Sequence, residues 1–186
     1  MKHKRNGVTL VELMVVLVIL GVLAALAAPS MADMWNRRRV AAVADEIAND
    51  LAFARSEAVA KGTNVQIHYK KSTDLSCYTV NYRGTVGFCN CLSTTAPACD
   101  PIDTTATEVK TVQIPGSLGV TFESTGATGI GANRIEFTFP QFTPNPADFS
   151  VLVSGRRGVS LKVQVNAMGR IKTCSPNGTM PGVASC

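Results

Sequence analysis

The chain has 186 residues, with 18 Lys or Arg, 13 Asp or Glu and 2 His, and its formal net charge is +5. This length favours one domain with a sizeable core over several domains. No GxSxG, HExxH or P-loop sequence is present, so we predict a protein that is not an enzyme and holds no cofactor.

The chain begins with a short basic segment, residues 1–7, and a long apolar stretch follows it. From Val8 to Ala28 the chain runs for 21 residues in which Glu12 is the one charged residue. A helix of that length rises about 1.5 Å per residue and crosses a hydrocarbon layer of about 30 Å. Because basic residues precede the stretch, we predict a single-pass transmembrane helix over residues 8–30, with a cytoplasmic N-terminus and a translocated remainder.

A secretory signal peptide is an alternative, because Ala25-Leu26-Ala27 resembles a small-residue cleavage site. Glu12 argues against it, since a carboxylate costs about 2.5–3.5 kcal/mol at the centre of a membrane helix and less near its end. A signal that is discarded gains nothing from this cost. A retained helix can use the carboxylate to bind a partner.

The segment Gly7-Val8-Thr9-Leu10-Val11-Glu12-Leu13 resembles the class III leader of type IV prepilins and pseudopilins. In that family a membrane peptidase cuts after the glycine and methylates the new N-terminus, which implies processing between Gly7 and Val8. The resemblance implies assembly roles for Glu12 and for Pro29, which stands where many pilins bend. Val8 departs from the more common phenylalanine or methionine.

The same resemblance implies partners and a location. The partners are the prepilin peptidase and other major and minor pilins. The protein would reside in the bacterial inner membrane, with its globular domain in the periplasm, and then enter a pilus or pseudopilus. In a filament, Glu12 would approach the charged amino group of a neighbour's Val8, an attraction that a dry core strengthens. The alternative role for Glu12 is that of an acid tolerated near the headgroups.

After Pro29 the pattern is that of an amphipathic helix. Apolar residues recur at three- and four-residue spacing at Val40, Val43, Ile47, Leu51, Ala54 and Ala58. Lys61-Gly62 is a typical helix end. We therefore predict one long helix from about Thr9 to Lys61, whose part over residues 31–62 packs on a globular domain. Three arginines, 37–39, would lie just outside the membrane, solvated or in contact with anionic lipid.

Residues 63–186 are predicted to form a β-rich domain. Alternation or β-branched content marks strands at Val65–Tyr69, Cys77–Tyr82, Glu108–Ile114, Val120–Ser124, Arg134–Phe139, Ser150–Ser154, Ser160–Asn166 and Arg170–Cys174. His68 lies in the first of these strands, and we assign it a structural role. Residues 84–107 are rich in Thr, Gly, Pro and Cys and are predicted to form a stapled loop.

All six cysteines follow the apolar segment: Cys77, Cys89, Cys91, Cys99, Cys174 and Cys186. An even number in loop-rich sequence predicts disulfides in an oxidising compartment. Six cysteines allow 15 pairings, and we favour Cys174 with Cys186 as a local pair. A metal site at Cys89, Cys91 and Cys99 is the alternative, which the lack of a paired CxxC or histidine ligand set disfavours, so we predict no metal.

The join between helix and sheet carries a second resemblance. The segments Ile47–Ala58 and Lys61–Val65 resemble the GspH/FimT family of minor pilins and pseudopilins. This resemblance implies an α+β fold of the type IV pilin kind, with a long N-terminal helix packed on an antiparallel β-sheet domain. A plainer interpretation is that Ala54 and Ala58 allow close packing, while Arg55 and Glu57 are surface charges.

The C-terminal part of the chain is basic, and no acidic residue follows Asp148. One predicted turn exposes Arg156 and Arg157 at its tip. A second, three-residue turn ends at Gly169, where a positive φ is favourable. This turn pairs Val165 with Ile171, so that the apolar residues share one face.

The segment Gly169-Arg170-Ile171-Lys172 resembles the G-R-x-R motif with which FimT-type minor pilins bind DNA during uptake. The resemblance implies non-specific binding of double-stranded DNA through Gly169, Arg170 and Lys172, with further basic residues at Arg156, Arg157 and Lys162. Lysine in the last place lacks the bidentate fork of arginine. Solvation of an outer strand is the alternative role of these charges.

The sequence thus predicts a minor type IV pilin that takes part in pilus assembly and binds DNA during natural transformation. One alternative is a minor pseudopilin of a type II secretion system with a purely structural role. Another is an adhesive tip subunit that uses the cysteine-rich loop.

Overall fold

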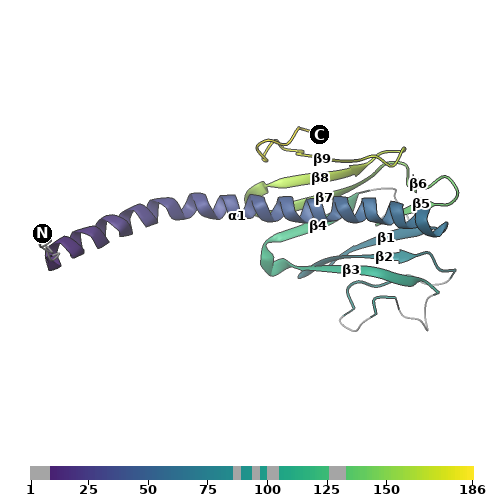
Figure 1. Cartoon of the computed structure of the whole chain (residues 1–186), viewed down its shortest axis with the longest axis horizontal. Helices are drawn as coiled ribbons and strands as arrows, with labels where there is room; N and C mark the ends of the chain where they lie inside the picture. The colour runs from purple at the N-terminus through teal and green to yellow at the C-terminus, as the bar shows by residue number, and fades with distance from the viewer. Residues whose placement is uncertain (1–8, 86–88, 94–96, 100–104, 126–132) are drawn as a thin grey trace, which may run out of the picture. The chain divides into compact units, whose positions relative to one another are not determined.

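The computed structural model describes residues 9–85, 89–93, 97–99, 105–125 and 133–186, without the side chains of residues 26–30. The chain divides into two compact units, Met1–Trp35 and Asn36–Cys186. The helix α1 (Leu10–Lys61) contributes to both units, whereas all the described strands belong to the second (Figure 1).

Thr9 caps the start of α1. Its hydroxyl accepts a hydrogen bond from the N–H of Glu12 at 3.3 Å, and its carbonyl accepts one from the N–H of Leu13 at 3.1 Å. This is the usual role of threonine before the first helical turn. The helix ends at Lys61. The predicted helix limits are therefore confirmed.

In the first unit, α1 carries an exposed apolar surface. Every described side chain from Leu10 to Ala25 is exposed, and Glu12 is the one charged residue among them. Within the described part of the chain, no helix combines the length and hydropathy of a membrane span. The predicted transmembrane segment, residues 8–30, includes residue 8 and the side chains of 26–30, which lie outside the description. The bend predicted at Pro29 stays a prediction.

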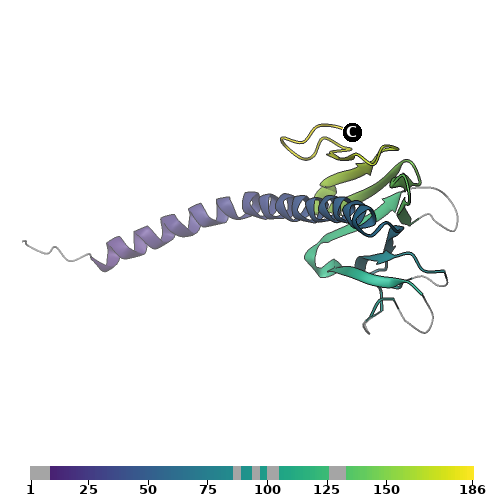
Figure 2. The same cartoon turned by 45° about the vertical axis from the view of Figure 1, so that its right-hand side comes forward.

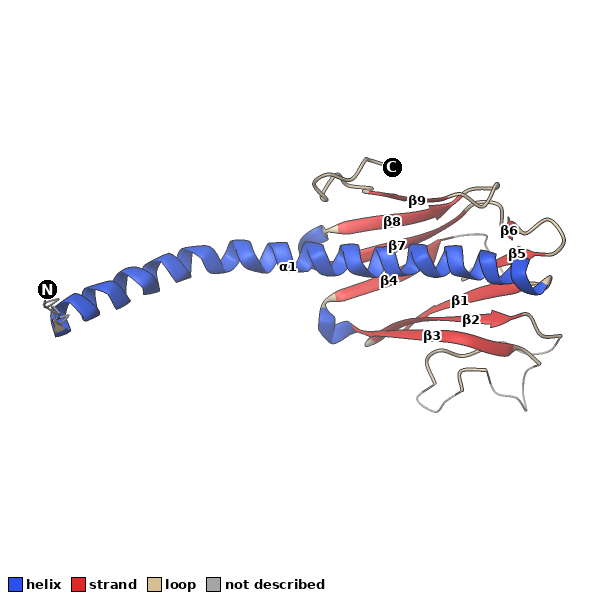
Figure 3. Ribbon diagram, viewed as in Figure 1, coloured by secondary structure: helices blue, strands red, loops and turns tan. Residues whose placement is uncertain are grey.

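The second unit contains two antiparallel sheets (Figure 3). Sheet A has the order β3-β2-β1-β5-β6, formed by β1 (Val65–Lys71), β2 (Leu75–Tyr82), β3 (Thr107–Pro115), β5 (Arg134–Thr138) and β6 (Thr143–Asn145). Sheet B has the order β4-β7-β8-β9, formed by β4 (Val120–Thr125), β7 (Phe149–Gly155), β8 (Ser160–Val165) and β9 (Ile171–Cys174). Short 3-10 turns, η1 (Gly116–Leu118) and η2 (Arg156–Gly158), connect β3 to β4 and β7 to β8.

Eight predicted strands match strands of the structure, and β6 is the described strand that the sequence did not reveal. Its middle residue is Pro144, which pairs with Phe137. Proline has no N–H to donate to a ladder, so it argues against a strand in sequence reasoning. The position of β6 at the edge of sheet A removes that objection, because an edge strand needs partners on one side only.

The second half of α1 lies along the inner faces of both sheets (Figures 1 and 2). The helix buries a stripe of small and branched residues, Val40, Ala44, Ile47, Leu51, Ala54 and Ala58, each of them fully buried. The predicted stripe is confirmed except at Val43, which is half-buried while Ala44 takes the buried place. Alanine in the last two positions lets the helix approach the sheets closely. Both sheets therefore share one core.

A buried polar contact fixes α1 against sheet A. The Tyr78 hydroxyl donates to the Asp50 carboxylate at 2.5 Å, and the Lys110 ammonium lies 2.7 Å from the same carboxylate. Burial raises the pKa of Tyr78 first, and the hydrogen bond to Asp50 raises it further. A second contact joins the Tyr82 hydroxyl to Glu57, so Glu57 is not merely a surface charge. These contacts set the position of the helix on the sheet.

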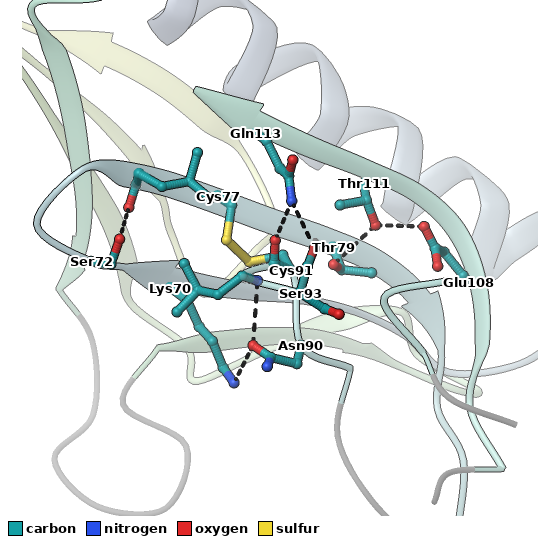
Figure 4. The surroundings of a disulfide bond; sticks show 12 residues. Lys70, Ser72, Cys77, Thr79, Asn90, Cys91, Ser93, Glu108, Thr111 and Gln113 are labelled. Carbon is teal, nitrogen blue, oxygen red and sulfur yellow. Dashed lines mark hydrogen bonds between the residues drawn. A yellow bond between two sulfur atoms is a disulfide. The ribbon is translucent and has the colours of Figure 1, made fainter. Parts of the chain in front are cut away.

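Three disulfides staple the domain: Cys77–Cys91, Cys89–Cys99 and Cys174–Cys186. The favoured local pair, Cys174 with Cys186, is confirmed. The alternative metal site is wrong, because Cys89, Cys91 and Cys99 are all oxidised. The Cys77–Cys91 bridge attaches the cysteine-rich loop to the outer face of sheet A, and Cys89–Cys99 closes a ring within the loop. Figure 4 shows the Gln113 amide donating to the carbonyls of Cys91 and Ser93, at 2.6 and 3.3 Å.

We distinguish two ends of the second unit by the residues of α1 that lie there. The proximal end holds Asn36, at which α1 joins the unit, and the distal end holds Lys61. The η2 turn lies at the proximal end, where Asn36 bonds to Arg156. The β8–β9 turn lies toward the distal end, where Arg55 bonds to Gly169. Basic residues of the C-terminal strands are thus divided between two ends.

Candidate functional site

The β8–β9 hairpin has the register expected from its sequence. Val165 pairs with Ile171, and Gln164 pairs with Lys172. The N–H of Asn166 donates to the carbonyl of Arg170 at 3.1 Å, next to the turn. Because side chains alternate along a strand, Arg170 and Lys172 share one face with Gln164. The predicted pairing is confirmed.

Asn166 holds the turn closed. Its side-chain Oδ1 accepts hydrogen bonds from the backbone N–H groups of Met168 at 3.1 Å and Arg170 at 2.8 Å. Its carbonyl accepts one from the N–H of Gly169 at 2.7 Å. Asparagine commonly stabilises turns in this way. The sequence contained this signal at Asn166, although our prediction rested on the loop length, the glycine and the apolar pairing.

Gly169 is required for two reasons. Its φ is +73°, a backbone conformation that favours glycine. A Cβ atom at this position would also lie 3.0 Å from the Cζ atom of Arg55. The Arg55 guanidinium donates to the Gly169 carbonyl at 3.1 Å and is half-buried. Arg55 therefore belongs to the hairpin site, which sequence reasoning missed because 114 residues separate the two partners.

The basic residues of the hairpin differ in their surroundings. Arg170 and Lys172 are exposed, whereas Lys162 is half-buried. Lys162 and Asp148 both line a hollow of about 300 Å³ on the outer face of sheet B. A carboxylate in the same hollow weakens the attraction of Lys162 for an anion. Arg170 and Lys172, with Arg55 beside the turn, are the better candidates for an anionic partner.

Arg156 and Arg157 do not join this group. Both are exposed on η2, at the proximal end. They precede β8, whereas Arg170 follows it, and a six-residue strand spans about 20 Å. The structure therefore separates the predicted basic set into a distal group and a proximal group.

The residues proposed for assembly lie in the first unit. Gly7 and Val8 are outside the described residues, as is the side chain of Pro29. Glu12 lies in the first turn of α1 with its side chain exposed. An acid near a helix N-terminus interacts favourably with the helix dipole, so this position suits a charged glutamate.

His68 lies on β1, on the outer face of sheet A, and is 9 % exposed. Burial first, and then the charges of Arg134 and Lys70, lower the pKa of His68 to about 4. A histidine with this pKa is neutral at neutral pH. Its buried position beneath the cysteine-rich side of the sheet agrees with the structural role predicted for it.

Two family models match the chain. The prokaryotic N-terminal methylation motif matches residues 2–28. The type II transport protein GspH matches residues 43–169, which is more than half of the chain. No curated protein matches the chain significantly in sequence.

Solved structures that match the chain include proteins of Pseudomonas aeruginosa and Vibrio cholerae. The type IV minor pilin FimU of Pseudomonas aeruginosa is 16% identical, with a TM-score of 0.51 over 79% of this chain and 96% of that chain. A second crystal form of FimU is 18% identical, with a TM-score of 0.47 over 76% of this chain and 97% of that chain. The minor pseudopilin EpsH of Vibrio cholerae is 10% identical, with a TM-score of 0.48 over 74% of this chain and 97% of that chain. The first of these likenesses supports the pilin-like α+β fold.

These matches fix the class of protein. The methylation motif implies residence in the inner membrane followed by incorporation into a pilus or pseudopilus, with prepilin peptidase and other pilins as partners. The family is structural and non-enzymatic. The chain belongs to the type II transport protein GspH family, as a minor pilin or pseudopilin of a type IV pilus or a type II secretion system.

Proposed function

We propose that this chain is a minor pilin of a type IV pilus, cut between Gly7 and Val8 and held in register by Glu12. The supporting observation is the exposed apolar surface of α1 from Leu10 to Ala25, which carries one charge. Such a surface is stable only where lipid or other apolar helices cover it. Release from the bilayer therefore requires helices of neighbouring subunits as the replacement.

Glu12 supplies the specificity of that exchange. Apolar side chains alone allow helices to slide past one another, since each register buries a similar area. A carboxylate in an apolar core is costly unless an opposite charge meets it. The amino group of a neighbour's Val8 is the matching charge, and it exists only after the leader has been removed. Processing and assembly are coupled in this way.

The three disulfides support the proposed orientation. Disulfides persist in oxidising compartments such as the bacterial periplasm. The second unit would therefore lie in the periplasm and the N-terminus in the cytoplasm.

Two variants of the full chain, co-expressed with a prepilin peptidase and candidate pilins, test this proposal. Gly7→Leu should leave the leader attached, as an intact mass would show. Glu12→Gln should be processed normally but lose cross-linking to the other pilins. Normal cross-linking of Glu12→Gln would contradict the register role. Cross-linking of the chain to pseudopilins of a secretion system, instead of to pilins, would identify it as a pseudopilin. Binding to a host surface through the cysteine-rich loop would identify it as an adhesive tip subunit.

We infer a second function, non-specific DNA binding, for the distal group Arg55, Arg170 and Lys172. The exposure of Arg170 and Lys172 on one face of the hairpin supports it, as does the guanidinium of Arg55 beside the turn. Contacts of this kind reach phosphates and carry no sequence information. Binding would therefore tolerate any sequence and weaken with salt.

The test is a salt series of double-stranded DNA binding by the full chain in detergent. Arg170→Gln with Lys172→Gln should lower affinity at low salt and reduce the slope of log K against log salt by ~0.9 for each lost phosphate contact. Arg156→Gln with Arg157→Gln removes the same charge at the proximal end and is the matched control. If both double variants lost the same DNA affinity, net charge alone would explain the binding, and the assignment of a site at the distal group would be overturned.

A further inference from the structure

Two distant segments of the chain bring five arginines to the proximal end of the second unit. Arg37, Arg38 and Arg39 come from α1, and Arg156 and Arg157 come from η2. We call these five residues the proximal arginine cluster. The two segments are more than a hundred residues apart in the sequence, so only the fold shows that they form one group.

Hydrogen bonds hold η2 against α1. The Asn36 side-chain amide donates to the Arg156 carbonyl at 2.7 Å, and the Arg156 N–H donates to Asn36 Oδ1 at 3.1 Å. The backbone of the turn also packs closely on the helix side chains, because a Cβ atom on Gly155 would lie 2.5 Å from Cγ2 of Val40. All these contacts use backbone atoms of the turn. The backbone of η2, and with it the two arginines, is thus held beside the helix.

Two helix arginines are held in the same region. The Arg39 guanidinium donates to the carbonyl of Leu118 in η1 at 3.1 Å, and the Arg37 guanidinium donates to the carbonyl of Thr179. Neither acceptor carries a negative charge. The positive charges of these arginines are therefore not cancelled by the partners that position them.

Acidic residues are scarce at this end. Among the described strand connections there (72–74, 116–119 and 155–159) and in the C-terminal segment 175–186, Asp74 is the one acidic residue. Its turn meets η1 through a hydrogen bond from the N–H of Gly116 to the Asp74 carbonyl at 2.7 Å. Asp33 precedes Arg37 by four residues on α1 and adds a second negative charge. Five positive charges against two negative charges still leave a positive end.

The sequence places this cluster close to the membrane segment. Arg37 follows Ala28, the last residue of the apolar stretch, by nine residues. Nine residues of α1 rise about 13 Å, and each interfacial layer of a bilayer is about 5–8 Å thick. With the reach of an arginine side chain and a Debye length of about 8–10 Å, the headgroups lie within range.

We propose that the proximal arginine cluster binds the phosphate groups of anionic lipids at the membrane surface while the subunit awaits assembly. The inference rests on the membrane insertion stated in the proposed function. In the proposed orientation these arginines stand on the translocated side, where the charge bias of membrane proteins disfavours them, so a compensating interaction is expected there. Arginine suits it, because its fork matches phosphate oxygens.

The bound lipids would hold the unassembled subunit at the bilayer. Each basic residue near an anionic surface contributes about fivefold to local affinity. The contact would be lost whenever the domain leaves the surface. Extraction into a filament must therefore overcome this electrostatic contact as well as remove α1 from the lipid.

Trp35, the one tryptophan of the chain, provides the test because it lies two residues before Arg37. The full chain is reconstituted in phosphatidylcholine vesicles containing some phosphatidylglycerol. Energy transfer from Trp35 to dansyl-labelled phosphatidylglycerol is compared with transfer to dansyl-labelled phosphatidylcholine. We expect a ratio above one at low salt that falls toward one at high salt. The double variant Arg156→Gln with Arg157→Gln should at least halve the amount by which this energy-transfer ratio exceeds one at low salt.

Arg170→Gln with Lys172→Gln is the control, since it removes the same charge from the distal group and should leave the ratio unchanged. A wild-type ratio of one at low salt, or equal losses in both double variants, would overturn the proposal. Flotation with the vesicles separates the two inferences. A chain that floats without lipid preference contradicts the lipid contact alone, whereas a chain that does not float contradicts membrane insertion as well.

Discussion

The two sheets present their inner faces to the same helix, yet their outer faces differ in what covers them. On sheet A the outer face is polar and buried, with Gln66, His68, Thr79, Asn81 and Glu136 all at most 9 % exposed. On sheet B the outer face leaves Lys172 exposed and Lys162 half-buried. The described part of the stapled loop contacts the outer face of sheet A at Lys70, Cys77 and Gln113, whereas sheet B remains open to partners.

The difference shows that a polar pattern on a strand does not by itself mean solvent exposure. Glu136 illustrates this, because its carboxylate is 2 % exposed and accepts from Asn64 at 2.9 Å and Arg83 at 3.0 Å. A buried acid of this kind stabilises the fold only while both partners remain. We therefore expect changes on the outer face of sheet A to affect stability and changes on that of sheet B to affect binding.

The largest effect is expected on removing the Cys77–Cys91 bridge with alanine at both positions. Its sequence separation of 14 corresponds to about 3 kcal/mol of unfolding free energy, and exposure of the polar face should add to this loss. Alanine at both Cys174 and Cys186 is the control, since its separation of 12 gives nearly the same entropic loss. Equal losses in urea denaturation would mean that the cover of sheet A adds nothing.

The next largest effect is a pH dependence that His68 imposes. Its pKa is about 4 in the folded state and 6.5 in the reference state, so the unfolded chain takes up the proton first as pH falls. The free energy of unfolding should therefore decrease from pH 6.5 to pH 4, by about 2–3 kcal/mol in total. Denaturation at several pH values measures the slope. His68→Gln should flatten it, and an unchanged slope in that variant would place the histidine in contact with solvent.

A smaller loss is expected for Gly169→Ala on the hairpin of sheet B. The positive φ should cost about 1–2 kcal/mol, and the new Cβ atom would press on Arg55. Gly182→Ala has a similar φ of +78° with no atom near the new Cβ, so it measures the backbone cost alone. Thermal unfolding of both variants gives the difference. If the two lose the same stability, the contact with Arg55 is not tight.

The smallest effect is expected on the open face of sheet B. Lys172→Gln should change the free energy of unfolding by less than about 0.5 kcal/mol, because the side chain is exposed. Glu136→Gln removes one charge from the outer face of sheet A and should cost more in the same urea titration. A similar cost for both variants would remove the distinction between the two faces.

Much of this fold follows from sequence patterns, and the exceptions have physical causes. Alternation predicted eight strands, while Pro144 concealed β6 at a sheet edge. Loop length and the glycine predicted the β8–β9 register. The pairing of Cys77 with Cys91 could not be predicted, because it depends on how the loop folds over sheet A and 15 pairings were open.

The candidate site was predicted less completely than the fold. Arg170 and Lys172 are exposed as expected from the hairpin. Arg55 was not predicted, because 114 residues separate it from its partner Gly169 in the sequence. Our prediction placed Arg156 and Arg170 in one DNA-binding group, although the strand β8 lies between them. The length of this strand was already evident from the sequence. The division of charge between the two ends could therefore have been foreseen.

The shared core has a consequence for the order in which the chain is made. Ile47 and Leu51 of α1 leave the ribosome early, whereas Val163 and Val165 of β8, which belong to the same core, are made about a hundred residues later. At about 5–20 residues per second, α1 waits some 5–20 s for these strands. During that interval the stripe on α1 lacks its final cover, which makes nascent subunits the species most in need of a chaperone.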